Sequence, residues 1–176
     1  MVPSAMPFDW WIIPSVSFLL FLFEYRKATK KNLEVALYIG VFLMVFDFVF
    51  ENVGTLVFGY WGTNSSFLSV LAVPIEVMLT CLLGGMAWAL YVLSAHASFV
   101  SKHRSRSSRT MRLSLILLDI FFFGAGGAAA EWCLVQRGVM YYAGGWTSLY
   151  AFVAYSATWT MLHILLSRLT PLRENI

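Results

Sequence analysis

Residues 33–58 read LEVALYIGVFLMVFDFVFENVGTLVF, and this stretch decides the class of fold. A helix needs about 20 mostly apolar residues to cross the hydrocarbon core of a bilayer, and this stretch is long enough. Two acids, Asp47 and Glu51, nevertheless lie well inside it. Residues four apart share one side of a helix, so the stretch predicts a membrane-spanning helix with an acidic face.

The composition of the whole chain agrees with this prediction. Of 176 residues, 60% are hydrophobic and only 12% are charged. Soluble domains have about 45–50% apolar and about 25% charged residues, so too few polar side chains are present to cover a water-facing surface. The net charge of +3 argues against a nucleic acid as partner. The sequence predicts one integral membrane domain over residues 1–176, multi-pass in the cell membrane and in contact with its lipid.

The predicted architecture is an all-α helical bundle with about five transmembrane helices. The apolar stretches are residues 8–23, 33–58, 74–95, 113–135 and 148–167. In this arrangement 11 of the 12 Lys and Arg residues fall on one side of the membrane, and Arg137 is the exception. Because Lys and Arg in short loops stay on the cytoplasmic side, we expect the N-terminus outside and the C-terminus in the cytoplasm.

Five acids lie inside the predicted spans, and no Lys or Arg accompanies them there: Asp47, Glu51, Glu76, Asp119 and Glu131. Each costs about 2.5–3.5 kcal/mol at the centre of a bilayer, so a functional role is expected. Four of them should converge on the outer half of the bundle, whereas Asp119 lies apart, nearer the cytoplasmic edge. Crowded carboxylic acids in a medium of low dielectric constant hold their protons, because desolvation and like charge both oppose ionisation. We therefore expect an acid–base site made by Glu51, Glu76, Asp47 and Glu131.

Aromatic side chains surround the predicted acids. The candidates for contact with a hydrophobic substrate are Phe46, Phe50, Tyr60, Trp61, Trp88, Trp132, Tyr142, Trp146 and Trp159. Aromatic faces attract cations, although aromatic residues near the ends of spans also form an ordinary interfacial belt. We expect a structural role for His163. The chain has no metal-binding pattern and no Gly-rich phosphate loop, so neither a metal nor a cofactor is expected.

The second and fourth spans share a loose pattern, which predicts a weak internal repeat. Residues 46–63 and 118–147 each place acids before an exit rich in glycine and aromatic residues. Substrate sites of membrane proteins often lie between such repeats. The small residues at 124–130 predict close helix packing, with a homodimer interface as the alternative.

Three short motifs resemble a known group of proteins. They are Glu51-x-x-Gly54, the FGYW sequence at 58–61 and the VPIE sequence at 73–76. The chain resembles the lycopene cyclase domain family, the related carotenoid hydratases and the membrane-bound terpene cyclases. Val77 stands where the lycopene cyclase domains have a second acid after their Pro-x-Glu.

The resemblance implies an isoprenoid substrate and metal-free chemistry. A buried carboxylic acid would protonate an alkene or epoxide, the substrate would cyclise, and loss of a proton would end the reaction. Glu51 and Glu76 would be the primary acid and base, with Asp47 and Glu131 as tuning groups or alternative donors. If water entered, the same site would hydrate the alkene.

Two other classes of function remain open from the sequence. Acids inside a membrane are also used by proton-coupled exporters of lipophilic cations. A noncatalytic membrane subunit would instead pair its acids with the bases of a partner.

Overall fold

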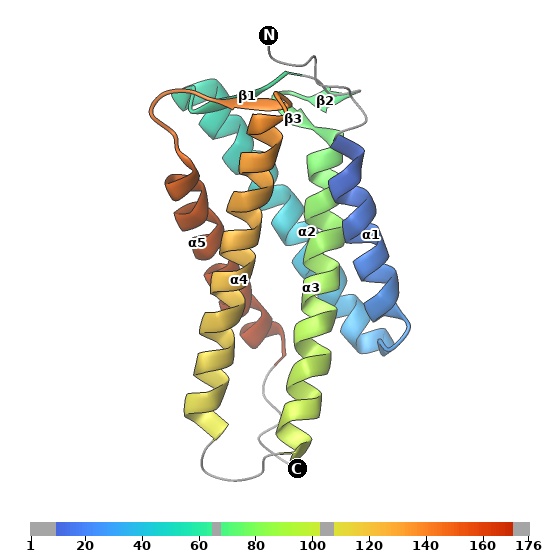
Figure 1. The fold of residues 1–176 in the computed structure, drawn as a ribbon. Coiled ribbons are helices and arrows are strands. Elements are labelled where there is room, and N and C mark those ends of the chain that lie inside the picture. Colours follow the sequence, from blue (N-terminus) through green and yellow to red (C-terminus); the bar gives the residue numbers. More distant parts are fainter. Residues whose placement is uncertain (1–9, 65–67, 103–107, 171–176) are drawn as a thin grey trace.

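A computed structural model describes residues 10–64, 68–102 and 108–170. For residues 95–102 and 108–112 it describes the backbone only. The described chain is mostly helical (Figure 1). Its elements are α1 (Ile12–Tyr25), α2 (Lys30–Asn52), η2 (Val53–Phe58), β1 (Trp61–Thr63), β2 (Ser69–Val70), β3 (Val73–Pro74), α3 (Ile75–Lys102), α4 (Ser108–Gln136), β4 (Met140–Tyr142) and α5 (Ser148–Leu169). The segment η2 is a π-helical turn that continues α2.

Four helices are long and apolar enough to cross a membrane. Their apolar segments are Lys30–Phe58, Ile75–Ser94, Leu113–Gln136 and Ser148–Leu169. The remaining helix, α1, is also apolar but has only 14 residues, or about 21 Å at 1.5 Å per residue. A hydrocarbon core is about 30 Å thick, so α1 is shorter than the full span that the sequence predicts. The helical membrane-type bundle is confirmed, with four long helices and a short one.

The helices pack as two groups. Helices α1 and α2 lie against α3, α4 lies against α5, and α2 also contacts α5 (Figure 1). Glycines bring α2 and α3 close together, because a Cβ added to Gly85 would lie 3.1 Å from the Cα of Gly40. The core between α2, α3 and α5 includes Ile39, Trp88 and Leu162.

The small residues of α4 also serve packing inside the chain. A Cβ on Gly124 would overlap the Ser156 hydroxyl, and one on Gly127 would lie 2.8 Å from the Tyr155 ring. Both contacts are with α5. Close helix packing is thus confirmed at these two glycines.

Short strands cover one end of the bundle. Strand β1 pairs with β4 in antiparallel fashion, with Trp61 opposite Tyr142. Strand β2 pairs with β3, with Ser69 opposite Pro74. The Asn64 backbone N–H donates to the Val139 carbonyl at 2.9 Å and strengthens the link between the two exits from α2 and α4. Strands of two or three residues carry too little periodicity to be recognised in a sequence.

Candidate functional site

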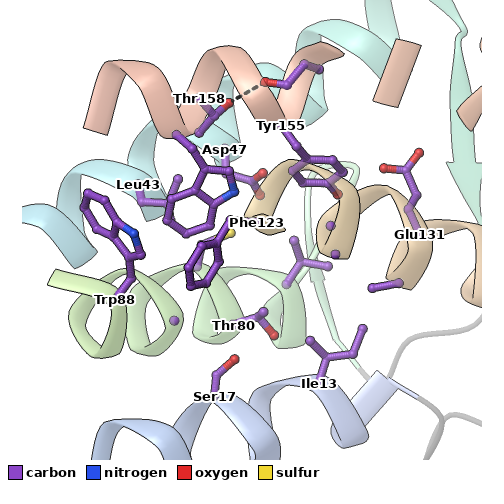
Figure 2. Close-up of a pocket in the computed structure, with 18 of the residues that line it drawn as sticks. Ile13, Ser17, Leu43, Asp47, Thr80, Trp88, Phe123, Glu131, Tyr155 and Thr158 are labelled. Carbon is purple, nitrogen blue, oxygen red and sulfur yellow. Dashed lines mark hydrogen bonds between the residues drawn. The ribbon is translucent and has the colours of Figure 1, made fainter. Parts of the chain in front are cut away.

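A cavity of about 1170 Å³ lies within the bundle. Residues from all five helices line it, because α4 packs mainly on α5 and leaves space toward α1 and α3. Figure 2 shows Ile13 and Ser17 of α1 on one side of this space and Tyr155 and Thr158 of α5 on the other. At the strand-covered end, the lining includes Trp61. The wall is mostly apolar and aromatic, so the cavity suits a hydrophobic ligand.

Three of the predicted acids meet at the strand-covered part of the cavity. Asp47 and Glu51 of α2 and Glu131 of α4 all line it. They lie close enough for their charges to interact with one another. The Cys81 thiol lies beside Asp47, whose Oδ2 atom is buried and has no hydrogen-bond partner among the described residues. We refer to Asp47, Glu51 and Glu131 as the carboxyl cluster.

Glu51 is held by a tryptophan from the following strand. The Trp61 indole Nε1–H donates to Glu51 Oε2 at 2.5 Å. This contact depends on Gly54, because a Cβ there would overlap the six-membered ring of Trp61. The π-helical turn after Glu51 ends at Gly59, whose φ of 62° favours glycine, and the chain then turns back over the helix end. The glycine of the Glu51-x-x-Gly54 motif therefore leaves room for the Trp61 ring that binds Glu51.

Glu131 is held in the same manner from the other exit loop. The Trp146 Nε1–H donates to Glu131 Oε1 at 3.2 Å. The two indoles lie in contact, with ring centroids of Trp61 and Trp146 4.5 Å apart. Tyr155 of α5 lies next to Glu131 in the wall of the cavity (Figure 2). An indole N–H can only donate, so each tryptophan engages one oxygen of its carboxyl group.

Tyr142 lies at the edge of the carboxyl cluster, in strand β4. Burial raises the pKa of Tyr142 to about 12, and the nearby Glu131 acts in the same direction. The hydroxyl therefore keeps its proton at neutral pH and remains a hydrogen-bond donor. It does not line the cavity itself.

Glu76 lies away from the carboxyl cluster's cavity. It is in the first turn of α3, fully buried, and does not line the cavity. Among the described residues, neither of its carboxyl oxygens has a hydrogen-bond partner. The expected convergence of four acids therefore reduces to three around one space.

Some of the predicted aromatic residues line the cavity and others do not. Those that line the cavity are Phe46, Phe50, Trp61, Trp88, Trp146 and Trp159. Phe46, Phe50 and Trp61 form a stacked row, with centroid distances of 6.1 and 5.6 Å. Tyr60 stacks behind Trp146 at 5.6 Å and does not line the cavity. Trp132 is 51% exposed and lies outside the lining, as an interfacial residue would.

A second polar group in the cavity contains Asp119, the acid that the sequence places apart from the other four. Asp119 Oδ2 accepts the Trp88 Nε1–H at 2.9 Å and contacts His163 Nε2 at 2.7 Å. These three side chains come from α4, α3 and α5, and all three line the cavity. Asp119 and His163 are 44 residues apart, so no local pattern links them. His163, for which we expect a structural role, thus lies on the cavity wall.

Within the described part of the chain, no group of three or more His, Cys, Asp or Glu side chains is arranged to hold a metal ion. Comparisons with protein-family models, curated proteins and solved structures find no match for this chain.

Proposed function

We propose that the protein is a membrane enzyme that cyclises a linear isoprenoid by acid catalysis. One observation carries the proposal: three carboxyl groups meet at one end of a single apolar cavity, and two of them accept hydrogen bonds from tryptophans that line the same cavity. Crowding keeps a proton on the cluster, and a carboxylic acid positioned beside a bound alkene can transfer that proton to it. The resemblance of the E-x-x-G and FGYW motifs to carotenoid and terpene cyclases points to the same chemistry.

The reaction needs no metal and balances within one substrate. A carboxylic acid gives its proton to a carbon of the alkene, whose π electrons form the new C–H bond and leave a carbocation. A second double bond of the same chain supplies the electron pair for the carbon–carbon bond that closes the ring. Loss of a proton from a neighbouring carbon forms a new double bond, so the product is an isomer of the substrate.

Glu51 is the favoured acid in this proposal. Trp61 engages its Oε2, which places the acidic proton on Oε1. After proton transfer the indole hydrogen bond becomes charge-assisted and stabilises the carboxylate. Asp47 and Glu131 line the same end of the cavity and surround Glu51 with further carboxyl groups. Glu131 replaces Glu76 as the partner of Glu51, because Glu76 does not line the cavity.

The proposed setting is the cell membrane, with α1 to α5 as five passes and the strand-covered end outside. The described bases support this orientation. At the strand-free end lie Arg26, Lys27, Lys30, Lys31, Lys102, Arg109, Arg112 and Arg168, whereas Arg137 lies at the strand-covered end. The proposal retains a parallel internal repeat, supported by the similar acid–indole hydrogen bonds of Glu51 and Glu131.

A proton-coupled exporter of lipophilic cations is the second candidate. The observation that favours it is the pair of Asp119 and His163, which places titratable groups toward the other end of the same cavity. An exporter must open this cavity to each side of the membrane in turn. The paired strands over the carboxyl cluster favour the enzyme, because they close that end.

Lipid analysis of a host that accumulates linear isoprenoids tests the proposal. Cells expressing the protein should contain a new cyclic isomer with the mass of a host isoprenoid, and cells expressing Glu51→Gln should lack it. The Trp132→Phe variant, altered on the exposed side of α4, serves as the matched control and should form the product. Proton flux driven by a lipophilic cation in vesicles, with no new isomer in cells, would favour the exporter instead.

A further inference from the structure

Acidic side chains outnumber basic ones on the described cavity wall, where His163 is the basic residue. Among the described residues, the cavity lining includes five acids, Glu24, Asp47, Glu51, Asp119 and Glu131, but neither Lys nor Arg. A carboxylate in a medium of low dielectric constant needs a positive partner or strong hydrogen bonds. A ligand that brings a positive charge would be favoured over a neutral one of the same shape.

Asp119 lies beside a group of packed aromatic rings on the cavity wall. Trp88 donates to its Oδ2, and Trp88 packs against Trp159 with ring centroids 5.2 Å apart. Phe123 packs against Trp159 at 4.7 Å, and His163 meets Trp88 edge-on at 4.9 Å. All four rings line the cavity (Trp88 and Phe123 are labelled in Figure 2). Aromatic faces and a nearby carboxylate are the combination that proteins use to bind organic cations.

Asp119 Oδ2 is the atom on which this group converges. The Trp88 N–H can only donate, so Asp119 Oδ2 accepts from it. His163 Nε2 lies 2.7 Å from the same oxygen. The side chains of Asp119 and His163 are only 14% and 9% exposed, so solvent screens the carboxylate weakly. A cation that enters the cavity can therefore interact with the Asp119 carboxyl group in a medium of low dielectric constant.

The group lies far from the carboxyl cluster. Asp119 and Glu131 are 12 residues apart on α4, which corresponds to about 18 Å along the helix. His163 and Tyr155 are eight residues apart on α5, or about 12 Å. An elongated hydrophobic ligand can therefore reach both ends of the cavity, with a positive charge held at one of them.

We infer that Asp119, Trp88, Trp159, Phe123 and His163 form a cation-binding site for the positively charged group of an elongated hydrophobic ligand. The inference rests on the cavity and on these contacts, and it does not require the proposed cyclisation. Two sources of the charge share this chemistry: a permanent ammonium group, and a carbocation that forms on an isoprenoid during cyclisation.

Matched probes test the site directly. The probes are dodecyltrimethylammonium, used below its micelle concentration, and its uncharged isostere with carbon in place of nitrogen. Binding of each radiolabelled probe to the purified protein in nanodiscs is measured, with empty nanodiscs subtracted. The protein should bind the ammonium probe at least about tenfold more tightly than the isostere, a preference expected from one carboxylate and several ring faces.

Asp119→Asn removes the charge but keeps an oxygen that can accept the Trp88 N–H. This variant should bind the ammonium probe about tenfold more weakly and the isostere unchanged, while Cys133→Ser, an exposed residue outside the cavity lining, should behave as the native protein. An ammonium preference that persists in Asp119→Asn would overturn the inference. So would an equal loss for both probes, or a loss in Glu51→Gln but not in Asp119→Asn.

Two further measurements identify the source of the charge. If the site serves a carbocation, the ammonium probe should inhibit formation of the cyclic isomer, and Asp119→Asn should relieve that inhibition. If it serves a permanent cation, proteoliposomes should accumulate the probe in an Asp119-dependent manner. Probe binding without any cyclic isomer from the native protein would refute the proposed function and leave the cation site standing.

Discussion

Replacing Trp61 by Phe tests how much the hydrogen bond from Trp61 to Glu51 contributes to the free energy of unfolding. Trp61 is only 4% exposed and supplies the one hydrogen bond to Glu51 found among the described residues. Phe keeps an aromatic ring for contact with Phe50 and Trp146 but has no N–H. The loss of a hydrogen bond to a buried carboxyl group costs about 1–3 kcal/mol. The smaller ring also leaves unfilled space over Gly54, so we expect the free energy of unfolding to fall by about 2–4 kcal/mol.

A double-mutant cycle isolates the hydrogen bond from the lost packing. The native protein, Trp61→Phe, Glu51→Met and the double variant would be unfolded reversibly in mixed micelles and followed by circular dichroism. The coupling energy between the two positions should be about 1–3 kcal/mol, because each single change removes the same interaction. The control Trp132→Phe should change stability by no more than about 0.5 kcal/mol, since that side chain is exposed. A coupling energy near zero would refute the view that Trp61 holds Glu51 in place.

Three further predictions concern glycine packing and topology. Gly54→Ala should displace the Trp61 indole and lower the free energy of unfolding by about 1–3 kcal/mol. Gly126→Ala should raise it by up to about 1 kcal/mol, because a Cβ at this position meets no atom within 4 Å. The same unfolding assay measures both variants, and equal effects would contradict the packing described for Gly54. Gly127→Leu should lower the free energy of unfolding by about 1–3 kcal/mol, because the larger side chain would overlap Tyr155. The particle mass measured by light scattering should not change. A change from dimer to monomer would show instead that Gly127 lies in an interface between two copies of the chain. In a background with Cys81 and Cys133 replaced by Ala, a membrane-impermeant maleimide should label Arg137→Cys but not Lys31→Cys in intact cells; the reverse labelling would invert the proposed orientation.

The sequence predicts the membrane-type bundle well because hydrophobic length is a strong local signal. Asp47 and Glu51 are four residues apart on a helix, and both line the cavity as their shared face implies. The first helix is less well predicted, since its apolar stretch at 8–23 is longer than the 14 residues that are helical. Residues 8 and 9 lie outside the described residues.

Features that depend on pairing between distant segments could not be predicted. The partners β1 and β4 contain three residues each and lie about 80 residues apart, so neither gives a clear pattern of its own. The contact between Asp119 and His163 depends on the rotation of α4 and α5 about their axes, which hydrophobicity alone does not fix. The same difficulty applies to Glu76. Its position in the sequence predicts a depth in the membrane similar to that of the carboxyl cluster, but its side chain does not line the cavity.

Deuterium incorporation tests the central proposal most directly. Purified protein in heavy water would be supplied with geranylgeraniol, squalene, squalene epoxide or lycopene, and the products would be analysed by mass spectrometry and NMR. A carboxylic acid that has exchanged with solvent delivers deuterium to carbon when it protonates an alkene. The account predicts a cyclic product from one of the alkene substrates that carries one deuterium on a ring carbon, and no such product from Glu51→Gln. A cyclic product without deuterium, or the same labelled product from Glu51→Gln, would contradict it.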